Sequence, residues 1–437
     1  MNTTKTSLLA LALTTVASLA TAEMQNTNRY SINERVPMNA TKYRAETSVV
    51  PVSQRVAKEN APLGVRAGSF VVTPKADLEE TYNDNVYATK NNTKSDFITT
   101  VRPEVAVQSN WSRHALNALA RAEMNKFADN SSENTNNTAL AIDGRVDVMK
   151  ETSLGGGVSW VRNHEERGDP NAIGSSVEPT AVDTKTARLG AYRGLGRFNV
   201  RVDGEAKTID FKNGYTTTGG TVNNSLRDRN EYLTSARVGY KATPGTEVFV
   251  KGEMDNRVYN QKGGTTVNRS NHGDKIVVGL DMEMTGKTKA EVYGGVMSRN
   301  YVDPSLKDNS GSATYGAKLL WNATDITSVM GSIDRSIEET SLANSSGYEN
   351  TSYRLGVEHS VMRNTVANAG LGYTTSDYKG TGVQRNDDVL MANVGAKYYF
   401  NRNFSTGASY EFRNRDSNIA NGGYDRNVFM LRLTGTY

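Results

Sequence analysis

Apolar and polar residues alternate one for one along about 18 segments of residues 68–437. In residues 197–210, for example, one set of alternate positions is apolar or small, and the other is almost entirely charged or polar. A period of two places the two sets on opposite faces of a strand, whereas a helix would scatter the charges around its circumference. So many strands with an apolar face and a polar face fit a barrel in a lipid bilayer, with oily residues facing lipid and polar ones facing a lumen.

The expected strands cover residues 68–87, 96–109, 113–127, 138–149, 153–164, 184–194, 197–211, 229–241, 245–259, 274–285, 288–300, 311–321, 325–338, 349–361, 364–376, 386–400, 403–414 and 426–437. Their connections alternate between tight turns such as 194–197 and long polar loops such as 164–183. Outer-membrane barrels combine short periplasmic turns, long extracellular loops and an even number of strands. We therefore predict an all-β, antiparallel transmembrane barrel of about 18 strands with both termini in the periplasm. A count of 16 and a large soluble β-sandwich remain alternatives.

Composition narrows the protein class. Hydrophobic residues make up only 37% of the chain, which excludes a bundle of transmembrane helices but fits strands that are half exposed to water. The chain has no cysteine, so thiolate metal ligands and thiol redox chemistry are excluded. Its 51 basic and 47 acidic residues are intermingled, without the basic block that is typical of nucleic-acid-binding proteins.

The N-terminus reads as a secretory signal peptide over residues 1–22. Lys5 precedes an apolar run over residues 8–19, and small residues at Ala20 and Ala22 indicate cleavage before Glu23. Residues 23–67 form a polar N-terminal extension, expected in the periplasm. We interpret it as a disordered tail or, from the valines at 49–52 and 56, as a segment that docks on a partner or enters the lumen.

The last strand alternates up to a terminal aromatic residue. This pattern is similar to the C-terminal signal by which bacterial barrels are recognised for insertion, carried here by Phe429, Leu431, Leu433, Gly435 and Tyr437. Aromatic residues on the expected lipid face lie near both strand ends, which predicts two interfacial girdles.

No set of residues predicts an active site, so we expect no enzyme activity and no cofactor. His164 and His272 are the only histidines expected at the rim beside carboxylates, and both are expected to be solvated loop residues. The Asn and Asp clusters at 83–85 and 129–130 lack the spacing of a dedicated calcium loop, so no metal site is predicted.

The lumen is where function is expected. The alternation directs inward the residues Arg102, Glu104, Arg121, Glu123, Arg145, Arg201, Asp203, Glu205, Lys207, Lys251, Glu253, Arg299, Arg354, Lys397, Glu411 and Arg432. These charges have two interpretations: cross-strand ion pairs that stiffen the wall, or groups that contact a polyhydroxylated or charged solute in passage. No continuous inward row of aromatic residues is visible, which disfavours a dedicated porin for small sugars.

Several motifs in order resemble one known family. Residues 70–74 (Phe-Val-Val-Thr-Pro), 82–86 (Tyr-Asn-Asp-Asn-Val), 95–96 (Ser-Asp), 102–105 (Arg-Pro-Glu-Val), 110–114 (Asn-Trp-Ser-Arg-His) and 162–170 (Arg-Asn-His-Glu-Glu-Arg-Gly-Asp-Pro) resemble the putative β-barrel porin 2 family of Gram-negative outer-membrane proteins. The resemblance covers roughly 68–437 and implies an outer-membrane barrel that serves capsule or exopolysaccharide export.

The leading hypothesis is export of exopolysaccharide or capsule through or beside a polar lumen. The alternatives are a general diffusion porin for small hydrophilic solutes and a plugged barrel that acts as a surface scaffold or adhesin. Expected partners are outer-membrane lipid and lipopolysaccharide, the barrel-insertion machinery, polysaccharide and periplasmic export components. Nucleic acid is not expected.

Overall fold

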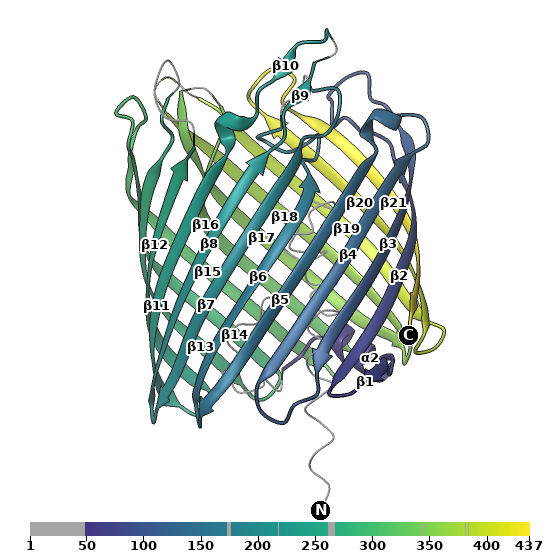
Figure 1. Cartoon of the computed structure of the whole chain (residues 1–437), viewed down its shortest axis with the longest axis vertical. Helices are drawn as coiled ribbons and strands as arrows, with labels where there is room; N and C mark the ends of the chain where they lie inside the picture. Colours follow the sequence, from purple (N-terminus) through teal and green to yellow (C-terminus); the bar gives the residue numbers. More distant parts are fainter. Residues whose placement is uncertain are drawn as a thin grey trace, which may run out of the picture.

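The computed structural model describes residues 49–172, 176–216, 218–260, 267–342, 344–380, 382 and 384–437. Eighteen antiparallel strands form one closed barrel (Figure 1). The fold class predicted from the alternation is therefore confirmed, and the count is 18 rather than 16. The expected signal peptide and its cleavage residues Ala20 and Ala22 lie outside the described residues.

The barrel strands are β2 (Phe70–Asn83), β3 (Asp96–Ser109), β4 (Ala115–Phe127), β5 (Thr135–Met149), β6 (Thr152–His164), β7 (Ala181–Leu195), β8 (Phe198–Phe211), β11 (Arg229–Thr243), β12 (Thr246–Tyr259), β13 (Asn271–Met284), β14 (Thr288–Tyr301), β15 (Asn309–Thr324), β16 (Thr327–Glu338), β17 (Ser345–Met362), β18 (Thr365–Gly380), β19 (Asn386–Tyr399), β20 (Phe404–Ser417) and β21 (Tyr424–Thr436). Outside the wall lie helix α2 (Val52–Glu59), strands β1 (Val65–Ala67), β9 (Gly214–Tyr215) and β10 (Thr221–Val222), and the 3₁₀ turns η1 (Ser131–Glu133) and η2 (Ser225–Arg227).

The sheet closes between its first and last barrel strands. β2 pairs with β21 from Lys75 opposite Thr436 to Asn83 opposite Val428. Every other barrel strand pairs with its neighbours in the sequence. Closure leaves no edge strand, so the backbone polar groups of the wall are bonded within the sheet, as a bilayer requires.

Short and long connections alternate around the barrel, as predicted. The turn between β7 and β8 holds only two residues, and its Gly196 has φ of +65°, a left-handed conformation that a side chain would strain. Between β6 and β7, by contrast, the chain takes residues 165–180 to return. Helix α2 and the C-terminus both lie at the short-turn end of the barrel (Figure 1).

The outer face is an apolar belt. Leu78, Val158, Leu189 and Leu431 are 51%, 58%, 74% and 65% exposed, although each lies within a strand. An apolar surface that surrounds the whole barrel is the surface that lipid covers. Among the described residues, no helix is both long and apolar enough to cross a bilayer.

Aromatic rings lie on this outer face near the short turns. The rings of Phe198 and Tyr240 are 5.0 Å apart on adjacent strands. Trp321, Phe400 and Phe404 are 46%, 56% and 54% exposed. They fit one of the two interfacial girdles that the sequence predicts.

Residues 49–67 differ from a disordered tail. They form α2 and then β1, which pairs with β2 from Val65 opposite Val72 to Ala67 opposite Phe70. Residues 23–48 of the expected extension lie outside the described residues.

Candidate functional site: the lumen and its two ends

The side chains between the apolar positions face the barrel interior. The structure places all 16 residues predicted to line the lumen at such positions, namely Arg102, Glu104, Arg121, Glu123, Arg145, Arg201, Asp203, Glu205, Lys207, Lys251, Glu253, Arg299, Arg354, Lys397, Glu411 and Arg432. Most of them form ion pairs within the wall rather than projecting singly into the lumen.

One dense network joins the first three strands to the last. The Arg102 guanidinium donates to Glu123 over 2.7 Å. It also lies 3.6 Å from Asp77 and 3.7 Å from Glu79. Arg432 extends the network, since its guanidinium lies 2.9 Å from Glu79. Four strands are thereby linked through side chains as well as through their backbones.

A second network lies on the wall formed by β12 to β14. Glu253 accepts a hydrogen bond from Lys251 and lies 3.4 Å from Lys275 on the neighbouring strand. Arg299 donates to Asp255 over 2.6 Å. Opposite charges on neighbouring strands attract each other, and the pairing cancels much of the charge that a solute would meet.

The other predicted residues follow the same rule with two exceptions. The further pairs are Arg121 with Glu104, Arg145 with Asp147, Arg201 with Asp203, Lys207 with Glu205 and Arg413 with Glu411. Lys397 lies over the Tyr399 ring, 4.8 Å from its centre. For Arg354, the described residues supply no ion-pair or hydrogen-bond partner, and its side chain lines a cavity described below.

At the long-loop end, the connection between β6 and β7 folds across the mouth. Its Glu166 lies between two wall arginines, 3.4 Å from Arg413 and in direct contact with Arg426. Arg415 donates to the Gly168 carbonyl oxygen over 3.3 Å. All three arginines come from β20 and β21 and are buried. The loop is therefore held against the wall that closes the barrel.

A second loop meets the first one over the lumen. The β16–β17 connection carries Glu339, which accepts from Arg257 over 2.7 Å and from the Tyr259 hydroxyl over 2.9 Å. Asn171 of the first loop donates to the Glu339 carbonyl oxygen over 3.1 Å, and its own side-chain oxygen accepts from the Ser341 amide over 2.9 Å. We call residues 165–172 and 339–342 the mouth bridge.

The mouth bridge spans the barrel. Its two loops arise on nearly opposite sides, separated by eight barrel strands one way (β7, β8 and β11–β16) and by ten the other way. Within the bridge, burial raises the pKa of the Asp169 carboxyl to about 6. The bridge therefore contains a group that changes charge in weakly acidic conditions.

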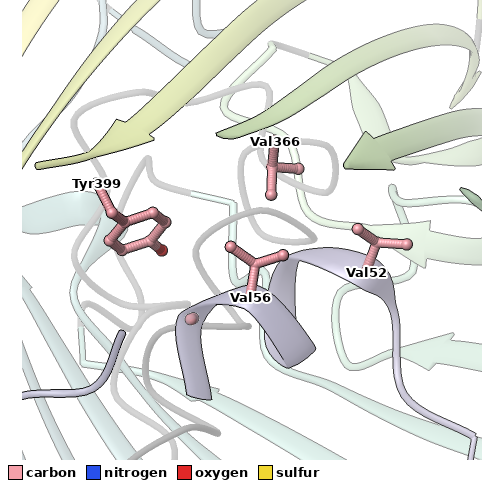
Figure 2. Packing of buried hydrophobic residues seen from close by; sticks show 5 residues of the cluster. Val52, Val56, Val366 and Tyr399 are labelled. Carbon is pink, nitrogen blue, oxygen red and sulfur yellow. The ribbon is translucent and has the colours of Figure 1, made fainter. Parts of the chain in front are cut away.

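Helix α2 occupies part of the short-turn end. Val52 and Val56 point from the helix toward Val366 and Tyr399 on the inner wall (Figure 2). Four residues apart, the two valines share one face of the helix. Together with Ala57, these residues form a small buried apolar cluster.

The wall also binds the free amides at the start of α2. The Val52 amide donates to the Ser328 hydroxyl over 2.9 Å. The Ser53 amide and hydroxyl each donate to a carboxylate oxygen of Glu358 over 2.9 Å. The first amides of a helix lack intrahelical partners, and a carboxylate satisfies them while interacting favourably with the helix dipole. Glu358 thus caps α2 from a strand 305 residues away.

A cavity of about 400 Å³ lies between the start of α2 and the part of the wall formed by β14 to β17. Its lining includes Pro51 and Gln54 from the helix side. The wall contributes charged and polar side chains from β14 to β17, namely Lys289, Glu291, Lys318, Ser332 and Arg354.

The two rim histidines make local contacts. His164 hydrogen-bonds to the Asn137 side-chain oxygen over 2.8 Å. His272 contacts Asp274 over 3.0 Å and Asn256 over 2.7 Å. His272 and Asp274 lie at outward positions of β13, away from the lumen.

The Asn and Asp clusters are used as hydrogen-bonding groups of the loops. Asp96 accepts from the amides of Asp129 and Asn130 over 3.1 and 2.8 Å. Asn85 donates to the carbonyl oxygen of Asp425 over 2.8 Å. In the described part of the chain, no three His, Asp or Glu side chains are grouped as metal ligands.

The predicted C-terminal signal lies in β21 and just beyond it. Phe429, Leu431, Leu433 and Tyr437 are 52%, 65%, 48% and 67% exposed on the outer face, and Gly435 shares this register. The Tyr437 amide donates to the Pro74 carbonyl oxygen over 3.0 Å, so the last residue is bonded to the first barrel strand. A role of this strand in insertion remains a prediction.

The sequence did not lead us to predict the contacts that form the mouth bridge. A signal was present, because Arg413, Arg415 and Arg426 occupy inward positions of two adjacent strands with Glu411 as the only acidic residue among them. Such an excess of inward cations calls for an acidic group from elsewhere in the chain. Glu166 is that group, but its loop was interpreted from the chemistry of His164 and from the motif at 162–170 rather than from its charge.

Known proteins resemble this chain mainly in architecture. The siderophore receptor PirA of Pseudomonas aeruginosa is 8% identical, with 84% of this chain and 80% of that chain covered and a TM-score of 0.46. OpdO (OccK3) of the same organism is 11% identical, with coverages of 84% and 95% and a TM-score of 0.43. The alcaligin receptor FauA of Bordetella pertussis is 11% identical, with coverages of 86% and 77% and a TM-score of 0.41. No curated protein matches the chain.

A family model supplies the assignment. The model described as "Putative beta-barrel porin 2" matches residues 60–437, a stretch that includes all 18 barrel strands and begins just after α2. The match covers most of the chain and agrees with a closed antiparallel barrel that has an apolar exterior and a polar lumen. The chain therefore belongs to the putative beta-barrel porin 2 family.

Proposed function

We propose that this barrel lies in the outer membrane of a Gram-negative bacterium, with its short turns and both termini in the periplasm. We further propose that it is not an enzyme and that its lumen serves the export of exopolysaccharide or capsule. The membrane assignment is supported by the apolar outer belt and by membership of a porin family. The export role is what the resemblance of the motifs over residues 70–170 implies.

The self-neutralised wall is the observation that carries the proposed cargo. Along the lumen, carboxylates and cations are mostly paired with each other, as in Arg102 with Glu123 and Arg299 with Asp255. Such a wall offers many hydrogen-bonding groups with little free charge. A polyhydroxylated chain could exchange water for these weak hydrogen bonds at successive positions without being bound tightly.

The two ends support a gated passage rather than a permanently open one. The mouth bridge crosses the long-loop end, and α2 occupies part of the short-turn end. Passage of a polymer would require at least one of them to move. This arrangement weighs against a general diffusion porin. Because both ends are partly closed, the same arrangement also supports a second candidate function, that of a plugged barrel that serves as a surface scaffold or adhesin.

Single-channel conductance of the refolded protein in a planar bilayer tests the proposal. The wild type is compared with a variant that lacks residues 49–67, each before and after addition of the producing strain's own polysaccharide. We expect small or intermittent conductance for the wild type and larger, steadier conductance for the deletion. The polymer is expected to block the open channel.

A clean deletion strain supplies the second readout. Unchanged surface and secreted polysaccharide in that strain would refute the export role. Steady conductance that polymer does not affect would favour the diffusion porin. Absence of conductance in every variant would favour the scaffold.

A further inference from the structure

We propose that the cavity between α2 and the wall binds an acidic sugar unit, in which one carboxylate is carried by a ring of hydroxyl groups. This inference rests on the proposed passage of saccharide, and it adds a defined binding site near the short-turn end. The cavity has a volume of about 400 Å³, within the range of small-molecule sites.

Two of the three cations that line the cavity, Lys318 and Arg354, lie in one row of the wall. Lys318 on β15 lies opposite Ser332 on β16, and Ser332 lies opposite Arg354 on β17. The three residues therefore form one row across the inner wall. With neighbouring strands about 4.8 Å apart, the backbones of the two cations are about 10 Å apart. Both side chains line the same cavity, so one ligand can contact both.

In the described part of the chain, most inward cations of the wall are paired with carboxylates, whereas the side chains of Lys318 and Arg354 are not. Among the described residues, no ion-pair or hydrogen-bond partner contacts the side chain of Lys318 or of Arg354. Glu291 on β14 lies opposite Lys318, but its carboxylate is 3.3 Å from the Arg237 guanidinium of β11. Elsewhere in the lumen most cations are neutralised by a carboxylate, whereas the two cations of this row remain available to bind an anionic ligand. A carboxylate can form charge-assisted hydrogen bonds with both groups.

The remaining lining suits a sugar ring better than a bare anion. Leu320 and Met330 supply apolar surface beside the row of cations. Ser332 and Gln54 supply hydrogen-bonding groups. A ring with apolar C–H faces and polar edges matches this combination, since ligand sites typically pair apolar walls with a few directed polar groups.

The site is shared between the wall and α2. Pro51 and Gln54 precede or belong to the helix, whereas Lys318 and Arg354 belong to the barrel. A ligand in the cavity would contact both parts, so binding and docking of α2 are expected to strengthen each other.

Isothermal titration calorimetry on the refolded full-length protein in detergent tests the site without requiring conductance. Glucuronate is titrated as the acidic sugar, glucose as the ring without the charge, and acetate as the charge without the ring. We expect glucuronate to bind at least tenfold more tightly than either glucose or acetate. Lys318→Gln and Arg354→Gln are each expected to weaken glucuronate binding about tenfold, since each removes one charge-assisted contact.

Lys241→Gln is the matched control. Lys241 also faces inward, but it lies near a short turn of β11 and outside the cavity. We expect it to bind glucuronate like the wild type, and all variants are checked for folding by heat-modifiable gel mobility. Equal binding of glucuronate and glucose, no binding of glucuronate, or the same loss in the control would overturn the site. Tight binding of glucuronate with normal polysaccharide in the deletion strain would retain the site and refute the export role.

Discussion

Glu166 is the residue on which docking of the mouth bridge depends most. Its carboxylate is 8% exposed and lies between Arg413 and Arg426, which are 4% and 2% exposed. Substitution Glu166→Gln keeps the shape of the side chain but removes the charge. Two buried guanidinium groups then lose a carboxylate, while the loop remains covalently attached and free to leave the wall.

The magnitude follows from the remaining partners. Removing one member of a buried ion pair typically costs about 3–5 kcal/mol, because the other member remains as an uncompensated buried charge. Arg413 keeps Glu411, 3.1 Å away, which places the expected loss near the lower end, about 3 kcal/mol. At 1.4 kcal/mol per tenfold change, the docked bridge becomes about a hundredfold less favoured.

Limited proteolysis of the protein in liposomes measures this shift. Trypsin can cut after Arg167, whose guanidinium is held by Glu133 and the Ser176 carbonyl oxygen in the docked loop. Cleavage there should accelerate strongly in Glu166→Gln, and channel openings should become more frequent. Glu178→Gln is the control, because Glu178 lies in the same loop but is exposed. If both variants are cut at the wild-type rate, the ion pairs of Glu166 do not hold the mouth bridge against the wall, and the prediction is wrong.

Three further predictions concern α2, pH and the lipid face. Val56→Asp places a charge in the apolar cluster under α2, so trypsin should cut after Lys58 far faster than in the wild type, and unchanged cleavage would contradict the packing. Because burial raises the pKa of Asp169 from 3.8 to about 6, docking of the bridge is strongest below pH 3.8 and weakens by about 3 kcal/mol as the pH rises through 6. Channels should therefore be open less often at pH 4 than at pH 7, and Asp169→Asn should abolish the difference; a variant that keeps the full difference would rule out this group. Val158→Arg on the lipid face should lower the free energy of unfolding in urea by about 2–4 kcal/mol. Ser159→Arg, which faces inward, should cost far less, and equal losses would contradict the assigned faces.

The barrel could be predicted closely because its determinants are local. The immediate neighbours of a residue such as Val158 indicate that it lies on the outer face of its strand. A shift of the strand by one residue would turn the charged side chains toward lipid, so only one register is allowed. The turn at Gly196 and the long connection after His164 mark opposite ends of the barrel for the same reason. Strand limits were less accurate, since β17 extends to Ser345, four residues before the predicted start.

The ends of the lumen could not be predicted in this way, because their contacts join distant parts of the chain. The Ser53–Glu358 hydrogen bonds span 305 residues, and the contact of Glu166 with Arg413 spans 247. The valines within residues 49–52 and at 56 suggested a segment that docks on a partner or enters the lumen, but a few apolar residues could not distinguish a docked helix from a tail.

The sequence by itself determined the closed barrel, its inward charges and its apolar belt, since alternation along each strand encodes all three. Only the tertiary structure decided which charges neutralise each other and which do not. Lys318 and Arg354 have the same alternation pattern as Arg102, which lies opposite Asp77 on the adjacent strand. Arg354 lies opposite Ser332 and Gly372. Lys318 does lie opposite a carboxylate, Glu291, but that carboxylate is 3.3 Å from the Arg237 guanidinium of β11. The physical reason is that an ion pair depends on which side chains of neighbouring and more distant strands come within reach, and register and closure of the barrel set that for all strands together.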